Sequence, residues 1–136
     1  MVESIYGIKN NLKNSKLKKF SEQQLLDCTY YAFYNSTTKL TANLGCNGGY
    51  MYYSFFYLTS KSIQSLKSYP YVGEVKSCKY KANFGVTKVS GVFTPSYKVG
   101  DHVSIKNAVS IQPISSHMYV ASDFYNYESG WCFVIL

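Results

Sequence analysis

The sequence predicts an α+β fold, in which a helical first half is followed by a half that contains strands. Residues 2–12 place apolar side chains at the three- and four-residue spacings of one helix face, at Val2, Ile5, Ile8 and Leu12. Residues 86–93 are instead rich in β-branched side chains, which favour strands. Helices that precede strands, rather than alternating with them, are typical of the α+β class.

A second helix is predicted to start at Ser21, which opens the capping-box pattern Ser-Glu-Gln-Gln. In this pattern the serine side chain accepts a hydrogen bond from the backbone of the third helical residue, here Gln24. The helix should end near Cys28. The mixture of Tyr, Asn, Ser and Thr over residues 29–45 then indicates a loop.

A glycine-rich turn at residues 45–49 separates this loop from a strongly apolar stretch. Glycine permits a positive φ and lets another backbone approach closely, so a ligand's backbone can lie against such a turn. Residues 50–58 are apolar and aromatic, and they predict a buried helix. A further short helix is expected at residues 63–66, before Tyr69-Pro70-Tyr71 imposes an extended turn.

The second half contains one more helix and more extended chain. Residues 103–111 carry apolar side chains at helical spacing, with Asp101 placed to cap the start and Pro113 placed to end the helix. Residues 114–121 read as a strand, and the aromatic residues 124–127 as irregular chain.

The net charge of +7 comes from lysines alone, because the chain has 14 Lys, no Arg and seven acidic residues. Nucleic-acid recognition relies on the bidentate contacts of Arg, so we expect no nucleic-acid partner. The dense stretch of Lys13, Lys16, Lys18 and Lys19 is interpreted as a solvated helix end and loop, with contact to a membrane surface or polyanion as the alternative. No apolar run approaches the ~18 residues of a membrane span.

Four cysteines occur, and no two of them are separated by only two residues, so zinc-ribbon spacing is absent. We expect no metal and no cofactor. In a short chain such cysteines favour disulfides and an oxidising compartment. Neither a charged leader nor an apolar run follows Met1, so we expect no signal peptide in this chain and an incomplete N-terminus.

Five segments in sequence order resemble the papain family of cysteine peptidases. They are the SEQxLxDC-like helix of residues 21–28, the GCNGG turn of residues 45–49, the YPY segment of residues 69–71 with Cys-Lys-Tyr at 78–80, Asp101 with residues 106–109 ahead of a P-x-S strand, and residues 124–130, which are similar to F-x-x-Y-x-S-G. The pattern is most similar to the cathepsin L-like endopeptidases. The resemblance implies an incomplete papain-like two-lobed fold, with residues 1–84 in the helical lobe and residues 85–136 in part of the β-rich lobe.

The resemblance also implies a site that binds peptide or protein substrates in extended form. Gly49 would pair with the backbone of the substrate residue two positions before the scissile bond, on a turn shaped by Asn47 and Gly48. Tyr50 and Met51 would line the pocket for that residue's side chain. Without the family, a tight turn that fixes a disulfide is the simpler reading of the same residues.

His117 matches the pocket-wall position of the family, which is usually a small residue, and not its catalytic histidine. Cys28 and Cys78 match a family disulfide pair, which would close a loop worth about 4 kcal/mol. Cys46 and Cys132 resemble half-cystines, and the resemblance gives neither a partner in this chain.

The family's nucleophilic Cys and general-base His have no counterparts here, so we assign no catalytic residue. Residues 2–5 align with the middle of the family's central helix, and residue 136 precedes its histidine, so we expect a fragment that is inactive alone. The alternatives are a non-catalytic peptide-binding or decoy homologue, and a basic surface-binding module. The family implies a lysosomal or vacuolar compartment, or secretion.

Overall fold

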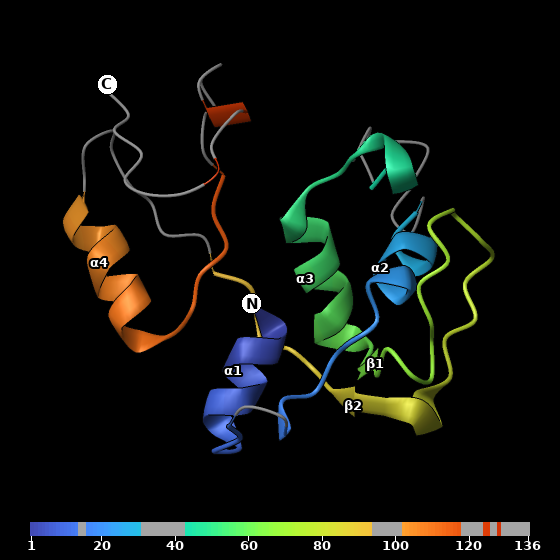
Figure 1. The fold of residues 1–136 in the computed structure, drawn as a ribbon, viewed down its shortest axis with the longest axis horizontal. Coiled ribbons are helices and arrows are strands. Elements are labelled where there is room, and N and C mark those ends of the chain that lie inside the picture. Colours follow the sequence, from blue (N-terminus) through green and yellow to red (C-terminus); the bar gives the residue numbers. More distant parts are fainter. Residues whose placement is uncertain (14–15, 31–42, 94–101, 118–123, 126–127, 129–136) are drawn as a thin grey trace.

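The structure is a computed structural model of the chain, and it describes residues 1–13, 16–30, 43–93, 102–117, 124–125 and 128. Figure 1 shows α2, α3 and the two strands grouped together, with α4 apart from them on the other side of α1. The elements in chain order are α1 (Val2–Lys9), α2 (Glu22–Cys28), the 3₁₀ helix η2 (Gly45–Asn47), α3 (Met51–Ser60), β1 (Ile63–Gln64), the 3₁₀ helix η3 (Ala82–Phe84), β2 (Gly85–Thr87) and α4 (His102–Ile111).

The two strands are short and antiparallel, with Ile63 opposite Thr87 and Gln64 opposite Gly85. The expected helix at residues 63–66 is therefore wrong. Tertiary partners take the backbone groups that a helix would use, because the Gln64 N–H donates to Gln24 Oε1 and the Gln64 C=O accepts from the Ser21 N–H. Ile63 is β-branched and buried in the core, which also suits a strand.

The expected strand at residues 86–93 is displaced and shorter, since β2 covers residues 85–87. Beyond it the Val89 N–H donates to the Leu58 C=O at 3.0 Å, outside the strand ladder. The strand expected at residues 114–121 is not formed over residues 114–117, and residues 118–121 lie outside the described residues. Asp101, the expected cap of α4, also lies outside them.

A compact apolar cluster joins α2, α3 and β1. Tyr6 on α1 meets it edge-on, with its ring 5.4 Å from that of Phe20. The buried members of the cluster are Phe20, Cys28, Tyr57, Leu58 and Ile63, and Val2, Tyr6, Leu25, Tyr80 and Val89 pack against them. The core therefore joins Phe20, which precedes α2, and Cys28 at the end of α2 to the last turns of α3 and to β1.

Two of the predicted helices form with altered details. The α1 helix ends at Lys9 rather than Leu12, because Asn11 adopts a φ of 52° and the Leu12 N–H turns back to the Gly7 C=O. The α3 helix forms where expected but is only partly buried, since Tyr52 and Phe56 are exposed.

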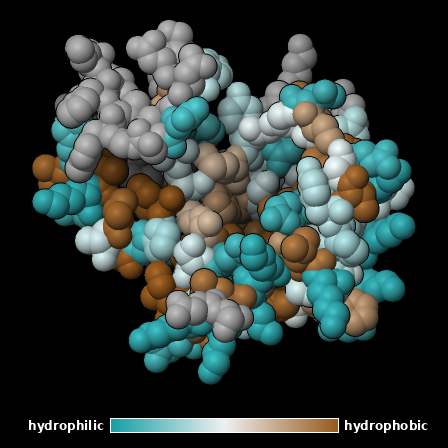
Figure 2. Space-filling model, viewed as in Figure 1, coloured by the Kyte–Doolittle hydropathy of each residue, from teal (hydrophilic) through white to brown (hydrophobic). Residues whose placement is uncertain are grey.

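Apolar side chains also lie at the surface of the second half. Figure 2, seen from the same side as Figure 1, shows apolar colour over the region of α4. The exposed apolar residues of this helix are Val103, Ile105, Val109 and Ile111. Among the described residues, no helix is long and apolar enough to cross a membrane.

Candidate substrate-binding turn

The glycine turn that the sequence predicts is present and tightly closed. Gly45 and Gly48 have φ values of 60° and 109°, which L side chains rarely adopt. The Leu44 N–H donates to the Gly48 C=O at 2.8 Å, and the Gly48 N–H donates to the Gly45 C=O at 3.3 Å. A 3₁₀ turn with these bonds holds Asn47 and Gly48 at the surface, where both are exposed.

Gly49 follows this closed turn and is itself exposed. The next residue, Tyr50, is fixed by its N–H, which donates to Asn43 Oδ1 at 2.8 Å. Within the described part of the chain, neither the N–H nor the C=O of Gly49 makes a hydrogen bond. The turn thus presents one exposed residue whose backbone N–H and C=O are both available, between two residues that are hydrogen-bonded.

Two of the predicted pocket residues lie at the start of α3. Tyr50 is 59% exposed, and its ring meets that of Tyr53 edge-on at 6.1 Å. Met51 is half-buried, and its Sδ contacts Ser115 Oγ. That contact brings residues 113–117 to the beginning of α3.

His117, the third predicted pocket residue, lies two positions beyond Ser115 and is exposed. The chain between Ser115 and His117 belongs to no helix or strand. The structure therefore brings the segment that carries His117 to Met51, and it shows no direct contact from His117 among the described residues.

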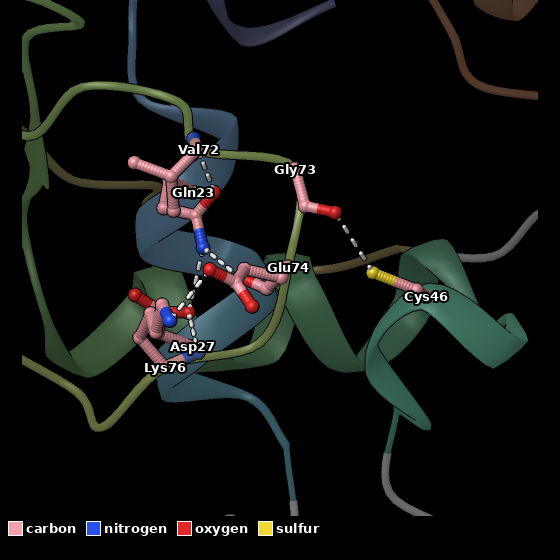
Figure 3. Close-up of polar contacts among 7 residues, drawn as sticks. All are labelled: Gln23, Asp27, Cys46, Val72, Gly73, Glu74 and Lys76. Atoms are coloured by element: carbon pink, nitrogen blue, oxygen red, sulfur yellow. Dashed lines mark hydrogen bonds and ion pairs between the residues drawn. The ribbon is translucent and has the colours of Figure 1, made fainter.

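The turn lies beside a second segment, residues 72–76, toward which Cys46 points (Figure 3). Cys46 Sγ lies 3.6 Å from the Gly73 C=O. A Cβ placed on Gly45 would collide with Cγ2 of Val75, so the Val75 side chain occupies the space that a side chain at residue 45 would need. The position of the turn therefore depends on what holds residues 72–76.

Two buried polar side chains of α2 hold that segment (Figure 3). Gln23 Oε1 accepts the Val72 N–H at 2.9 Å, and Gln23 Nε2 donates to the Glu74 C=O at 2.7 Å. Asp27 Oδ1 accepts the Lys76 N–H at 2.8 Å and also Gln23 Nε2 at 2.8 Å. The spacing of four residues puts Gln23 and Asp27 on one face of the helix, so a single turn of α2 binds the whole segment.

Tyr69 completes this arrangement from the other side. Its hydroxyl donates to Asp27 Oδ2 at 2.7 Å and accepts the Lys79 N–H at 3.0 Å. Burial raises the pKa of Tyr69 to about 12, and its hydrogen bond to Asp27 adds to the rise although the Lys79 N–H opposes it. The phenol therefore stays protonated and keeps donating to the carboxylate.

The structure joins Cys28 and Cys78 in a disulfide with an S–S distance of 2.02 Å, the pair that the family resemblance implies. Cys46 is free and exposed, and Cys132 lies outside the described residues. Among the described residues, no group of three His, Cys, Asp or Glu side chains is placed to hold a metal ion. Lys13, Lys16, Lys18 and Lys19 are exposed.

Sequence reasoning missed the residues that support the turn. Gln23, Asp27 and Asn43 are polar, and polar side chains on a helix or loop ordinarily indicate a solvent-facing position. Each is buried here, with 1%, 6% and 9% of its surface exposed. Their one sequence signal is the four-residue spacing of Gln23 and Asp27, which places both on one helix face.

Known proteins share this architecture and sequence. A cathepsin L-like proteinase of Fasciola hepatica is 36% identical over 121 residues, covering 88% of this chain and 34% of its own length. Zingipain-2 of Zingiber officinale is 36% identical, covering 95% of this chain and 53% of its own length. The solved structure of a digestive procathepsin L 3 of Tenebrio molitor is 31% identical with a TM-score of 0.62, and the match covers 80% of this chain and 31% of that one.

This chain therefore spans about a third to a half of the length of these relatives. A cysteine protease of Carica candamarcensis gives a TM-score of 0.58 at 27% identity, which supports the same α+β papain-like architecture. The model of the papain family cysteine proteases matches residues 1–134, almost the whole sequence. The chain belongs to the papain family of cysteine proteases.

Proposed function

We propose that this chain provides the peptide-binding wall of a papain-family cysteine peptidase, with Gly49 as the residue that pairs with the substrate backbone. The observation that carries the proposal is the exposed backbone of Gly49, whose N–H and C=O have no partner in the described part of the chain. An extended peptide offers complementary N–H and C=O groups and can add to such an edge. The absent side chain of glycine lets the two backbones approach.

The side chain of the paired substrate residue would lie against Tyr50 and Met51. Tyr50 offers an exposed ring and Met51 a half-buried, adaptable thioether. The contact between Met51 and Ser115 supports placing His117 on the far wall of the same pocket. Asn47 and Gly48 would shape the approach to Gly49 rather than bind the side chain.

We further propose that this chain does not cleave peptides by itself. A cysteine nucleophile needs a base within hydrogen-bond reach. Cys28 and Cys78 are consumed by the disulfide, and the Cys46 thiol lies against the Gly73 carbonyl rather than a histidine. Incubation with an epoxide inhibitor of cysteine peptidases should leave all thiols unmodified, and stoichiometric labelling with peptide turnover would overturn this part of the proposal.

The second candidate is a non-catalytic homologue that captures peptides as a decoy. The same available N–H and C=O of Gly49 favour it. Both candidates take peptide or protein ligands. They differ in whether the chain acquires activity when the remainder of a papain-type domain is supplied, and gain of turnover on such completion would support the peptidase. The disulfide and the cathepsin relatives support a lysosomal or vacuolar compartment, or secretion.

Peptide pairing can be tested directly at Gly49. The ¹⁵N-labelled chain is titrated with an N-acetylated leucyl-leucyl-lysine amide, and with an analogue N-methylated at the leucine that precedes lysine. We expect the first peptide to shift the Gly49 amide resonance and slow its hydrogen exchange, and the analogue to do neither. An unmoved Gly49 resonance, or an equal response to both peptides, would contradict the proposed pairing.

A further inference from the structure

Asn43 lies outside the glycine turn in sequence but touches it from inside. Although polar, it is 9% exposed, and it is fully hydrogen-bonded. Its Nδ2 donates to Thr29 Oγ1 at 2.7 Å and to Ser54 Oγ at 3.1 Å, while its Oδ1 accepts the Tyr50 N–H at 2.8 Å. One side chain therefore links the end of α2, the first turns of α3 and the residue after Gly49.

Asn43 also explains why residue 49 is a glycine. A Cβ placed on Gly49 would collide with Asn43 Oδ1 and would lie 2.8 Å from Asn43 Cγ and 3.0 Å from Asn43 Cβ. These contacts are closer than van der Waals packing permits. The amide of Asn43 therefore occupies the space in which a side chain at residue 49 would have to stand.

The two neighbours of Gly49 are held by different groups. The Gly48 C=O accepts the Leu44 N–H at 2.8 Å, and the Tyr50 N–H donates to the Asn43 amide at 2.8 Å. Leu44 and Asn43 are consecutive, so one short stretch of chain fixes both sides of Gly49. The N–H and C=O of Gly49 itself are left between them without a partner in the described part of the chain.

We infer that Asn43 is a positioning residue for peptide binding, which sets the orientation of the Gly49 N–H and C=O through Tyr50. The inference rests on the proposed pairing of Gly49 with a substrate backbone. Asn43 touches no substrate in this scheme. It acts by holding Tyr50 N–H and by filling the space behind Gly49, so that the exposed N–H and C=O are presented in one fixed orientation.

Two variants of similar shape separate the hydrogen bond from simple packing. Asn43→Leu fills the space but cannot accept the Tyr50 N–H, whereas Asn43→Asp retains an oxygen acceptor for it. We expect Asn43→Leu to speed hydrogen exchange of the Tyr50 amide by roughly five- to tenfold, the fold-change of one lost net hydrogen bond, and Asn43→Asp to restore slow exchange. Asn107→Leu, an exposed change on α4, serves as the control.

The same variants are titrated with the N-acetylated leucyl-leucyl-lysine amide and its N-methylated analogue. Asn43→Leu should weaken binding of the first peptide at least about fivefold and erase the difference between the two peptides, while Asn43→Asp recovers both. If Asn43→Leu binds the first peptide as tightly as the wild-type chain does and still discriminates against the N-methylated analogue, the inference is wrong and the proposed function stands.

A stability cycle tests the positioning without any peptide. Gly49→Ala and Asn43→Ala are combined, and the unfolding constant is measured in urea for each variant. Because Asn43→Ala removes the atoms nearest the added Cβ, Gly49→Ala should raise the unfolding constant roughly tenfold more in the wild-type background than in Asn43→Ala. Equal effects in both backgrounds would refute the inference, even if the wild-type chain bound no peptide and the proposed function itself had failed.

Discussion

Asp27→Asn is the sharpest test of how the glycine turn at residues 45–49 is supported. The carboxylate accepts three hydrogen bonds, from Gln23 Nε2, the Lys76 N–H and the Tyr69 hydroxyl. The first two converge on Oδ1, and the phenol donates to Oδ2. An asparagine with its carbonyl oxygen in the Oδ1 position keeps two of these bonds and places an NH₂ group opposite the Tyr69 hydroxyl, a donor against a donor.

Three contributions set the change in the free energy of unfolding that Asp27→Asn should cause. Leaving the buried Tyr69 donor unsatisfied costs about 2 kcal/mol, and loss of charge from the two remaining bonds costs about 1 kcal/mol. An amide is easier to bury than a carboxylate, which returns about 1 kcal/mol. The free energy of unfolding should therefore fall by about 2 kcal/mol, a large part of the stability of a small domain.

Urea unfolding measures this change, and Tyr69→Phe provides the matched cycle. In the wild-type chain, Tyr69→Phe removes both the donor to Asp27, worth about 2 kcal/mol, and the acceptor of the Lys79 N–H. In Asp27→Asn the hydroxyl has already lost its acceptor, so the same change should cost about 2 kcal/mol less, because only the bond from the Lys79 N–H is then removed. If Tyr69→Phe costs the same in both backgrounds, or if Asp27→Asn is as stable as the wild type, the bond assignment within this network is wrong.

Three further outcomes can be checked in the same assay. Because the pKa of Tyr69 is raised from 10.0 to about 12, the stability it contributes should be intact below pH 10 and lost toward pH 12, and Tyr69→Phe should remove that part of the pH profile. Leu58→Ala, at a site 1% exposed, should cost about 2–5 kcal/mol, against less than about 1 kcal/mol for the half-exposed Leu44→Ala. The joint change of Cys28 and Cys78 to Ala should cost about 4 kcal/mol, because their disulfide closes a 50-residue separation in the unfolded chain. A loss below about 1 kcal/mol would show that the unfolded chain keeps residual structure across this loop without the disulfide.

The local signals in the sequence predicted the structure well where they act over a few residues. The N-cap at Ser21 is present, since its Oγ accepts the Gln24 N–H at 2.9 Å. The reciprocal arm of the capping box is not formed, because Gln24 Oε1 accepts the Gln64 N–H and the Ser21 N–H donates to the Gln64 C=O, while Gln24 Nε2 donates to Tyr57 Oη and the Ser62 C=O. A capping residue exposed on an isolated helix would turn back to its own backbone, and burial against α3 gave Gln24 better partners.

The errors arise where distant segments decide the conformation. Residues 63–66 have helical spacing in isolation, yet the Leu66 N–H donates to the Lys19 C=O and the Gln64 N–H to Gln24. These partners lie 40 or more residues away in sequence, and no pattern within the segment reveals them. For the same reason the turn at residues 45–49 was predictable from its glycines, whereas its support by Asn43 and Asp27 was not.

The α2 helix directs three separate segments through buried polar side chains rather than through apolar contact. Its inner face carries Gln23 and Asp27 toward residues 72–76, and Gln24 toward residues 62–64. Its C-cap residue Thr29 accepts from Asn43. Apolar packing tolerates small shifts of one surface over another, whereas hydrogen bonds fix both distance and direction. A backbone that must align with a bound peptide needs the fixed distances and directions of hydrogen bonds. The buried polar side chains of α2 therefore suit the role proposed for Gly49.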